Sequence, residues 1–166
     1  MPLTLHTSQV KKMALLVVRM RGTVNVPYWA LTTLKSLNLN KRFSATLVPE
    51  TSNYLGMLRK VNQWVAWSKA DSDTIKILIE KRGKKKVSEL DSGKEKKTKS
   101  EYKGIDELVT VIASDKIKFS EQNNFKPWFT LNPPKGGFKK SSKKQFSDGG
   151  ILGNNKELVE IVKRMI

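Results

Sequence analysis

The stretch Ala14-Leu15-Leu16-Val17-Val18-Arg19-Met20-Arg21-Gly22 decides the fold of this chain. Its part from Ala14 to Met20 is short, apolar and rich in Leu and Val, which is typical of a buried β-strand. The strand ends in the basic turn Arg21-Gly22. The apolar run Met13–Val18 stops at Arg19, so it is too short to span a membrane and lacks the small-residue cleavage site of a signal peptide. The stretch therefore predicts one strand of a globular sheet.

Two helices and two further strands are predicted to follow it. A helix opens at Asn25 and Pro27, a second strand alternates apolar and polar residues over 42–48, and a second helix begins at Thr51 or Ser52. The stretch 64–67 can end that helix or begin a third strand, and we favour the strand. The helices place apolar residues at helical spacing: Tyr28, Leu31 and Leu34 in the first, and Leu55, Leu58 and Val61 in the second. This order predicts an α+β fold in which residues 14–68 form a two-layer β-α-β-α-β sandwich, with both helices on one face of a small sheet.

An insertion and a C-terminal extension are predicted around this core, within a single domain overall. Residues 69–124 form a helical and lysine-rich insertion, with helices over 71–81 and 105–112 and an exposed loop over 84–103. Residues 125–166 form an edge strand, a basic loop rich in Gly and Lys, and a last helix that packs on the core. Pro127 favours an edge position for the strand over 125–131. Asn154, with Glu157 three residues later, predicts the start of the last helix.

The charge of the chain favours a polyanionic partner. It has 32 Lys and Arg against 15 Asp and Glu, a formal net charge of +17 and a pI near 10.1. The positive side chains of a compact protein with such an excess repel one another unless a polyanion binds. Nucleic acid is therefore the leading partner, and an anionic membrane is the next. The absence of cysteine excludes disulfides, thiolate metal sites and cysteine nucleophiles.

The segment Asn132–Asn155, called here the glycine–lysine segment, is the strongest candidate for contact with phosphate. It holds five of the ten glycines and five lysines against one acid, Asp148. Glycine lets a donor-rich backbone approach a partner closely, and lysines supply point charges beside it. Within it, Gly150 to Gly153 has the spacing of a KH-type clamp on RNA, and we weigh that role equally with a simple turn into the last helix.

Enzymatic chemistry has little support in the sequence. His6 is the only histidine and lies near the terminus, so no histidine-based catalytic or metal cluster can form. The acids lie mostly at helix starts or among lysines, where capping and solubility explain them. The run Gly149–Gly153 lacks the following Gly-Lys-Ser or Gly-Lys-Thr of a nucleotide loop. The sequence therefore predicts no catalytic residues, no metal and no cofactor.

Basic residues at the ends of the predicted core elements complete the candidate surface. Any one of them alone is better explained as a solvated charge, but together with the lysines of 135–144 they predict a surface that tracks phosphates. They are Arg19, Arg21, Lys41, Arg42, Arg59 and Lys60. Trp64, Trp67 and Trp128 are better explained as core residues, whereas Trp29 and Phe138 have polar or basic neighbours and are better candidates for stacking on bases.

Several ordered strings resemble a known family. The strings are Arg19–Asn25, Thr46–Thr51, Tyr54–Asn62, Leu131–Phe138 and Phe146–Asn154. They are similar to the archaeal type of the universal large-subunit ribosomal protein thirty family, whose eukaryotic counterpart is large-subunit protein seven. The resemblance is continuous over 14–67 and from 125 to the end. The stretch 68–124 departs most from the family pattern.

The resemblance implies a cytoplasmic structural constituent of the large ribosomal subunit that binds rRNA and neighbouring ribosomal proteins, without catalysis, cofactor, small-molecule substrate or membrane. An assembly factor of the same fold is the alternative. It also implies a ferredoxin-like sandwich with an antiparallel sheet. Together with the basic pattern, the RNA-binding residues expected are Arg19, Arg21, Gly22, Asn25, Arg42, Ser52, Asn53, Gly56, Met57, Lys60, Pro133, Pro134, Lys135, Gly136, Gly137, Lys139, Lys140, Lys143, Lys144, Gly149 and Gly150.

Overall fold

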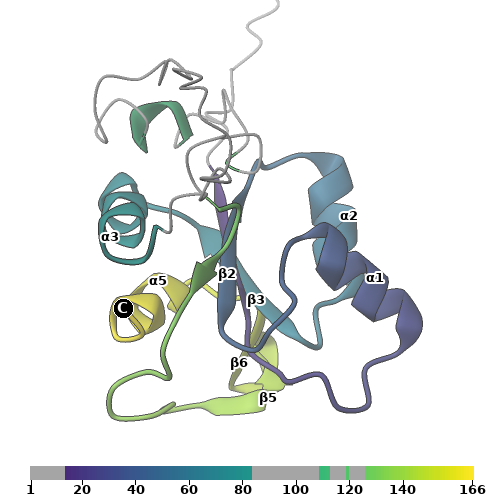
Figure 1. Ribbon diagram of the computed structural model, residues 1–166. Helices are drawn as coiled ribbons and strands as arrows, with labels where there is room; N and C mark the ends of the chain where they lie inside the picture. Colours follow the sequence, from purple (N-terminus) through teal and green to yellow (C-terminus); the bar gives the residue numbers. More distant parts are fainter. Residues whose placement is uncertain (1–13, 84–108, 113–118, 120–125) are drawn as a thin grey trace, which may run out of the picture.

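The computed structural model describes residues 14–83, 109–112, 119 and 126–166, which form one mixed sheet with helices packed against it (Figure 1). The sheet has six strands in the order β4-β2-β1-β3-β6-β5. The strands are β1 (Leu15–Arg19), β2 (Ser44–Val48), β3 (Val65–Lys69), β4 (Phe129–Thr130), β5 (Ser141–Gln145) and β6 (Gly150–Asn154). The helices are α1 (Tyr28–Ser36), α2 (Ser52–Lys60), α3 (Ser72–Arg82), α5 (Leu158–Lys163) and the 3-10 helix η2 (Phe146–Asp148).

The predicted order of strand, helix, strand, helix, strand is present from β1 to β3. β1 lies between β2 and β3 and is antiparallel to both, with Leu16 opposite Leu47 on one side and Ser68 on the other. The stretch 64–67, which the sequence left open, belongs mostly to β3. The helix predicted over 71–81 is α3, and the strand predicted near Pro127 is the two-residue edge strand β4. The lysine-rich loop predicted over 84–103 lies outside the described residues, as does most of the helix predicted over 105–112.

The two helices of the core, α1 and α2, lie on one face of the sheet as predicted, whereas α3 and α5, from outside residues 14–68, cover the other face and add a third layer. Leu15 and Val17 join α1 and α2 in one apolar cluster, whereas Leu16 and Val18 join α3 and α5 in another. Figure 1 shows α1 and α2 on one side of the sheet and α3 and α5 on the other. The unbroken apolar sequence of β1 agrees with burial on both faces. All five residues of β2 are buried for the same reason, so Ser44 and Thr46 are not on a solvated face.

The glycine–lysine segment contains two strands, where the sequence predicted a loop. β6 pairs in parallel with β3, and β5 pairs in parallel with β6, so the sheet is mixed rather than antiparallel. Gly150 explains part of the difference, because a Cβ at this position would collide with the backbone of Lys144 in β5. The Gly150–Gly153 run is therefore part of a strand, neither a free clamp nor a turn.

The last helix starts later than predicted, and the first helix turns a different face to the core. The last helix begins at Leu158, after β6 has ended at Asn154, and its N-cap residue is Glu157. The backbone N–H of Glu157 donates to Asn155 Oδ1 at 2.8 Å, and Asn155 Nδ2 donates to the Ile151 carbonyl at 3.1 Å. In α1, Leu34 is buried as expected, but Tyr28 is 83% exposed and does not face the core.

Candidate nucleic-acid interface

One end of the sheet, called here the loop end, gathers most of the predicted basic residues. It is the end where β1 finishes and where β2, β3 and β6 begin, since Arg19 lies opposite Val65 and Ala66 lies beside Gly153. The connection after β1 is joined there to the start of β2, because the Phe43 N–H donates to the Arg19 carbonyl at 2.8 Å. Figure 1 shows β5 and the β1–α1 connection at this same end, the lower one in the view.

Arg19 fixes the loops of the loop end. Its side chain is 1% exposed and donates four hydrogen bonds to backbone carbonyls. Nε reaches the Arg21 carbonyl at 3.0 Å and Nη2 the Gly22 carbonyl at 2.9 Å, while Nη1 reaches Leu39 and Asn40 at 2.8 and 3.1 Å. Arg19 was expected to touch RNA, but these bonds give it a positioning role: it ties the β1–α1 connection to the α1–β2 connection.

The charge of Arg19 adds to the positive field of this end. Burial lowers the pKa of its guanidinium, because desolvation disfavours the charged form. The four carbonyl acceptors offset that cost, and no carboxylate is within ion-pair distance of Arg19 among the described residues. The Arg19 guanidinium therefore interacts with backbone carbonyls rather than with a carboxylate, and its charge lies beneath an exposed basic surface.

Arg21 and Arg42 have exposed guanidinium groups near the buried side chain of Arg19. Arg42 donates from Nε to the Met20 carbonyl at 3.0 Å, and its guanidinium lies over the Phe43 ring, 4.6 Å from the centroid. Arg21 donates from Nη1 to the Gln63 carbonyl at 3.3 Å. Each guanidinium keeps further N–H donors exposed, a geometry suited to phosphate oxygens. Gly22 and Asn25 are exposed in the same connection, where Asn25 has a φ of 55°.

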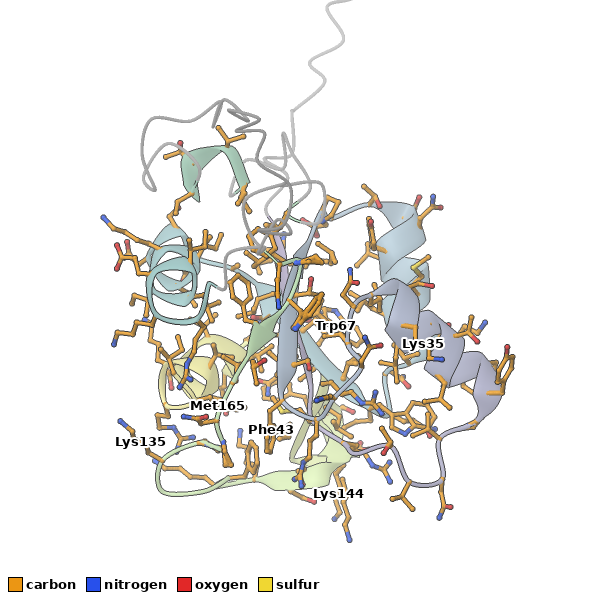
Figure 2. All side chains as sticks on the ribbon, viewed as in Figure 1. Lys35, Phe43, Trp67, Lys135, Lys144 and Met165 are labelled. Atoms are coloured by element: carbon orange, nitrogen blue, oxygen red, sulfur yellow. The ribbon has the colours of Figure 1, made fainter. Side chains whose placement is uncertain are left out.

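The lysines of the glycine–lysine segment fall into two groups. Lys140 is neutralised by Glu157, with Nζ 2.7 Å from Oε1, and lies 5.1 Å from the centroid of Phe146. Lys135, Lys139, Lys143 and Lys144 are exposed, and none of them forms an ion pair within the described part of the chain. Figure 2 shows Lys135 and Lys144 on opposite sides of the lower edge of the molecule. The second group is therefore better suited to bind phosphate than Lys140.

The remaining residues predicted in this segment differ in their access to a partner. Pro133, Gly136, Gly137 and Gly149 are exposed, and the three glycines have φ values of 77°, 70° and 75° that favour glycine. Pro134 and Gly150 are buried, so their contacts are with the chain itself. The segment is held near α5 by the Lys135 N–H, which donates to the Arg164 carbonyl at 3.0 Å.

The predicted residues of α2 form an exposed stripe. Asn53, Gly56, Met57 and Lys60 recur at helical spacing and are all exposed, with Ser52 exposed at the start of the helix. Lys60 lies toward the loop end, because α2 leads into the start of β3. The other end of the stripe lies near the opposite end of the sheet. The structure thus joins one end of the α2 stripe to the loop end but does not bring Ser52 and Asn53 there.

Neither the backbone conformation nor steric crowding within the described chain requires glycine at positions 22 and 56. Neither has a positive φ, and a Cβ at either position would meet nothing within 4 Å. In the interior of a helix, Gly costs about 0.5–1 kcal/mol relative to Ala. The described part of the fold therefore does not require glycine at position 56.

Carboxylates are scarce on this side of the molecule. Residues 14–70 contain a single acid, Glu50, whose Oε2 lies 3.4 Å from Lys69 Nζ. No group of three or more potential metal ligands is found in the described ranges, and no helix there could cross a membrane. The scarcity of acids in residues 14–70 suits a polyanionic partner.

Sequence reasoning missed two features of this surface. The ring of Phe43 lies 6.1 Å from that of Phe138, which links the start of β2 to the glycine–lysine segment. The second feature is the burial of Arg19, which holds the two connections together but was predicted to be a surface residue. The available signal was its position between the apolar residues Val18 and Met20.

Comparison with known proteins identifies close relatives. The family model described as Ribosomal protein L30p/L7e matches residues 15–65. A Cenarchaeum symbiosum protein named Large ribosomal subunit protein uL30 is 43% identical over 157 residues, which cover 92% of this chain and 98% of that protein. Proteins of the same name from Nitrosopumilus maritimus and Korarchaeum cryptofilum are 40% and 37% identical, covering 92% and 90% of this chain and 98% and 93% of their own lengths.

Proposed function

The chain belongs to the ribosomal protein L30p/L7e family, and on this premise we propose that it is a structural constituent of the large ribosomal subunit that binds large-subunit rRNA. Similarity that spans nearly the whole length of relatives named for that subunit supports the proposal. The same similarity places the protein in the cytoplasm as part of the ribosome, with rRNA and other ribosomal proteins as neighbours. Catalysis has no part in the proposed role.

The observation that supports RNA binding best is the charge at the loop end. Arg21, Arg42, Lys139, Lys143 and Lys144 are exposed there, above the buried cation of Arg19. Contacts of this kind bind the phosphate backbone and 2′-hydroxyls of folded RNA, so the protein recognises mainly shape. We further propose that the core from β1 to β3 corresponds to a ferredoxin-like sandwich, to which 69–124 and 125–166 are added as insertion and extension.

The residues proposed to touch RNA are those of the predicted set that the structure exposes, other than the ion-paired Lys140. They are Arg21, Gly22, Asn25, Arg42, Ser52, Asn53, Gly56, Met57, Lys60, Pro133, Lys135, Gly136, Gly137, Lys139, Lys143, Lys144 and Gly149. Lys140 contributes less, because Glu157 neutralises it. Arg19, Pro134 and Gly150 support the surface from beneath.

Sedimentation distinguishes this function from that of an assembly factor with the same fold. We expect the protein to co-sediment with mature large subunits and with translating ribosomes, because a structural constituent stays in the finished particle. The measurement is quantitative detection of the protein across a sucrose gradient. Its confinement to precursor particles would assign it to assembly instead.

A further inference from the structure

Large apolar side chains are exposed on α1 and α2 and in the connection before α1. Four such side chains are exposed in the described part of the chain: Val24 (84%), Tyr28 (83%), Trp29 (45%) and Met57 (36%). Val24 lies in the β1–α1 connection, Tyr28 and Trp29 are the first two residues of α1, and Met57 belongs to the α2 stripe. Single exposed apolar residues are ordinary on protein surfaces, whereas a group on one face marks a site of interaction.

Trp29 is held in a fixed orientation within this group. Its ring meets that of Trp64 edge to face, with centroids 5.9 Å apart and planes at 80°. Lys60 Nζ lies over the Trp29 ring, 5.7 Å from its centroid, so the aromatic side chains adjoin the α2 stripe. An aromatic group fixed beside a cation loses little entropy on binding and offers both stacking and charge.

The charges around these rings indicate what kind of partner binds this surface. Lys60 lies over the Trp29 ring, Arg59 beside it in the sequence is exposed, and the only acid of residues 14–70 is Glu50, which is paired with Lys69. Gly56, one turn before Lys60, leaves room for close approach to the α2 backbone. A partner must therefore combine a flat apolar group with negative charge and must lie close to the helix.

We propose that this aromatic surface binds an unpaired nucleotide of the RNA, with its base against Tyr28 and Trp29 and its phosphate toward Lys60. The inference rests on the proposed function and adds to it, because contacts to phosphate and 2′-hydroxyl alone require no aromatic group. Base stacking on aromatic side chains tolerates any sequence, so the site recognises an exposed base rather than a particular one.

Filter binding to large-subunit rRNA transcribed from the Nitrosopumilus maritimus sequence tests the proposal. Tyr28→Ala is expected to bind on the order of tenfold more weakly, the loss typical of one stacked base. Its salt dependence should stay that of the wild type, because stacking releases no counterions. Gly56→Ala is expected to bind several-fold more weakly, about twofold to tenfold, while its melting temperature stays equal or rises.

A matched control lies outside the proposed surface. Lys126 Nζ lies 5.9 Å from the centroid of Trp128, beside the edge strand β4, so this pair repeats the arrangement of Lys60 and Trp29. Trp128→Ala should bind within about twofold of the wild type, whereas Trp29→Ala should lose affinity as Tyr28→Ala does. Since Trp29 also packs on Trp64, the far more exposed Tyr28 is the decisive variant.

The outcomes separate this inference from the proposed function. Wild-type binding with a steep salt dependence, together with unchanged binding by Tyr28→Ala and Gly56→Ala, would overturn the stacking site and leave rRNA binding intact. That result would mean that the aromatic surface contacts a protein instead. Failure of the wild type to bind large-subunit rRNA would instead count against the proposed function itself.

Discussion

Replacement of Lys139, Lys143 and Lys144 with alanine is expected to weaken binding to large-subunit rRNA about 100-fold at about 0.1 M salt. These three lysines are exposed at the loop end and form no ion pair within the described ranges, so each is available to displace a counterion from RNA. One such contact changes the logarithm of affinity by about 0.7–0.9 for each tenfold change in salt. Three contacts together therefore account for about two logarithmic units.

The salt dependence identifies the cause of the loss. With about eight neutralised phosphates, the wild type should show a log–log slope of roughly −6 to −7, and the triple variant should show a slope shallower by about 2 to 3. Lys140→Ala should change both quantities less than any one of the three, because Glu157 already neutralises Lys140. The measurement is filter binding at several salt concentrations, with circular dichroism to verify the fold.

A double variant of equal charge provides the control for replacement of Lys143 and Lys144 alone. Lys81 on α3 and Lys126 before β4 form no ion pair within the described ranges and do not belong to the loop end. Their replacement with alanine removes the same net charge as Lys143→Ala with Lys144→Ala, so it should reproduce only the small long-range effect of charge on affinity. An equal loss in both double variants would show that total charge, rather than the loop end, determines binding.

Arg19→Met is expected to lower the free energy of unfolding by about 3–5 kcal/mol. The side chain is 1% exposed, and its four hydrogen bonds connect the carbonyls of residues 21 and 22 with those of residues 39 and 40. Methionine replaces the apolar stem but leaves these acceptors without a donor. Urea denaturation followed by tryptophan fluorescence measures the loss.

Two further substitutions define the role of the guanidinium. Arg19→Lys should recover only part of the stability, because an ammonium group is a single point and cannot reach acceptors on both loops. Arg21→Met should cost less than about 1 kcal/mol, since the Arg21 side chain is exposed and makes one hydrogen bond of 3.3 Å. A free energy of unfolding for Arg19→Met within about 1 kcal/mol of the wild type would contradict the positioning role.

The sequence predicted the elements from β1 to α2 because each has a strong local signal, whereas β3 was only favoured over a continuation of α2. The apolar run of β1 and the helical spacing of Leu55, Leu58 and Val61 depend only on neighbouring residues. The same local signals were weaker at the C-terminus. β5 is a polar strand of Ser, Lys and Gln at the sheet edge, and only its pairing with β6 makes it a strand.

Tertiary contacts also decided which predicted site residues are accessible. Arg19 and Lys139 are both basic residues in the sequence, yet one is buried beneath two loops and the other is exposed. Gly150 and Gly56 differ in the same way: the backbone of Lys144 requires the first to be glycine, whereas nothing in the described chain requires it of the second. Residue type and spacing carry no information on such contacts between distant segments.

Crosslinking of the protein to RNA in intact large subunits, with both partners sequenced, tests most directly whether this surface binds rRNA. We expect crosslinks to large-subunit rRNA from the peptides that contain residues 139–149 and 53–60, because these present the exposed lysines and the α2 stripe. Crosslinks to RNA confined to α3, or their complete absence from the loop end and α2, would contradict this assignment.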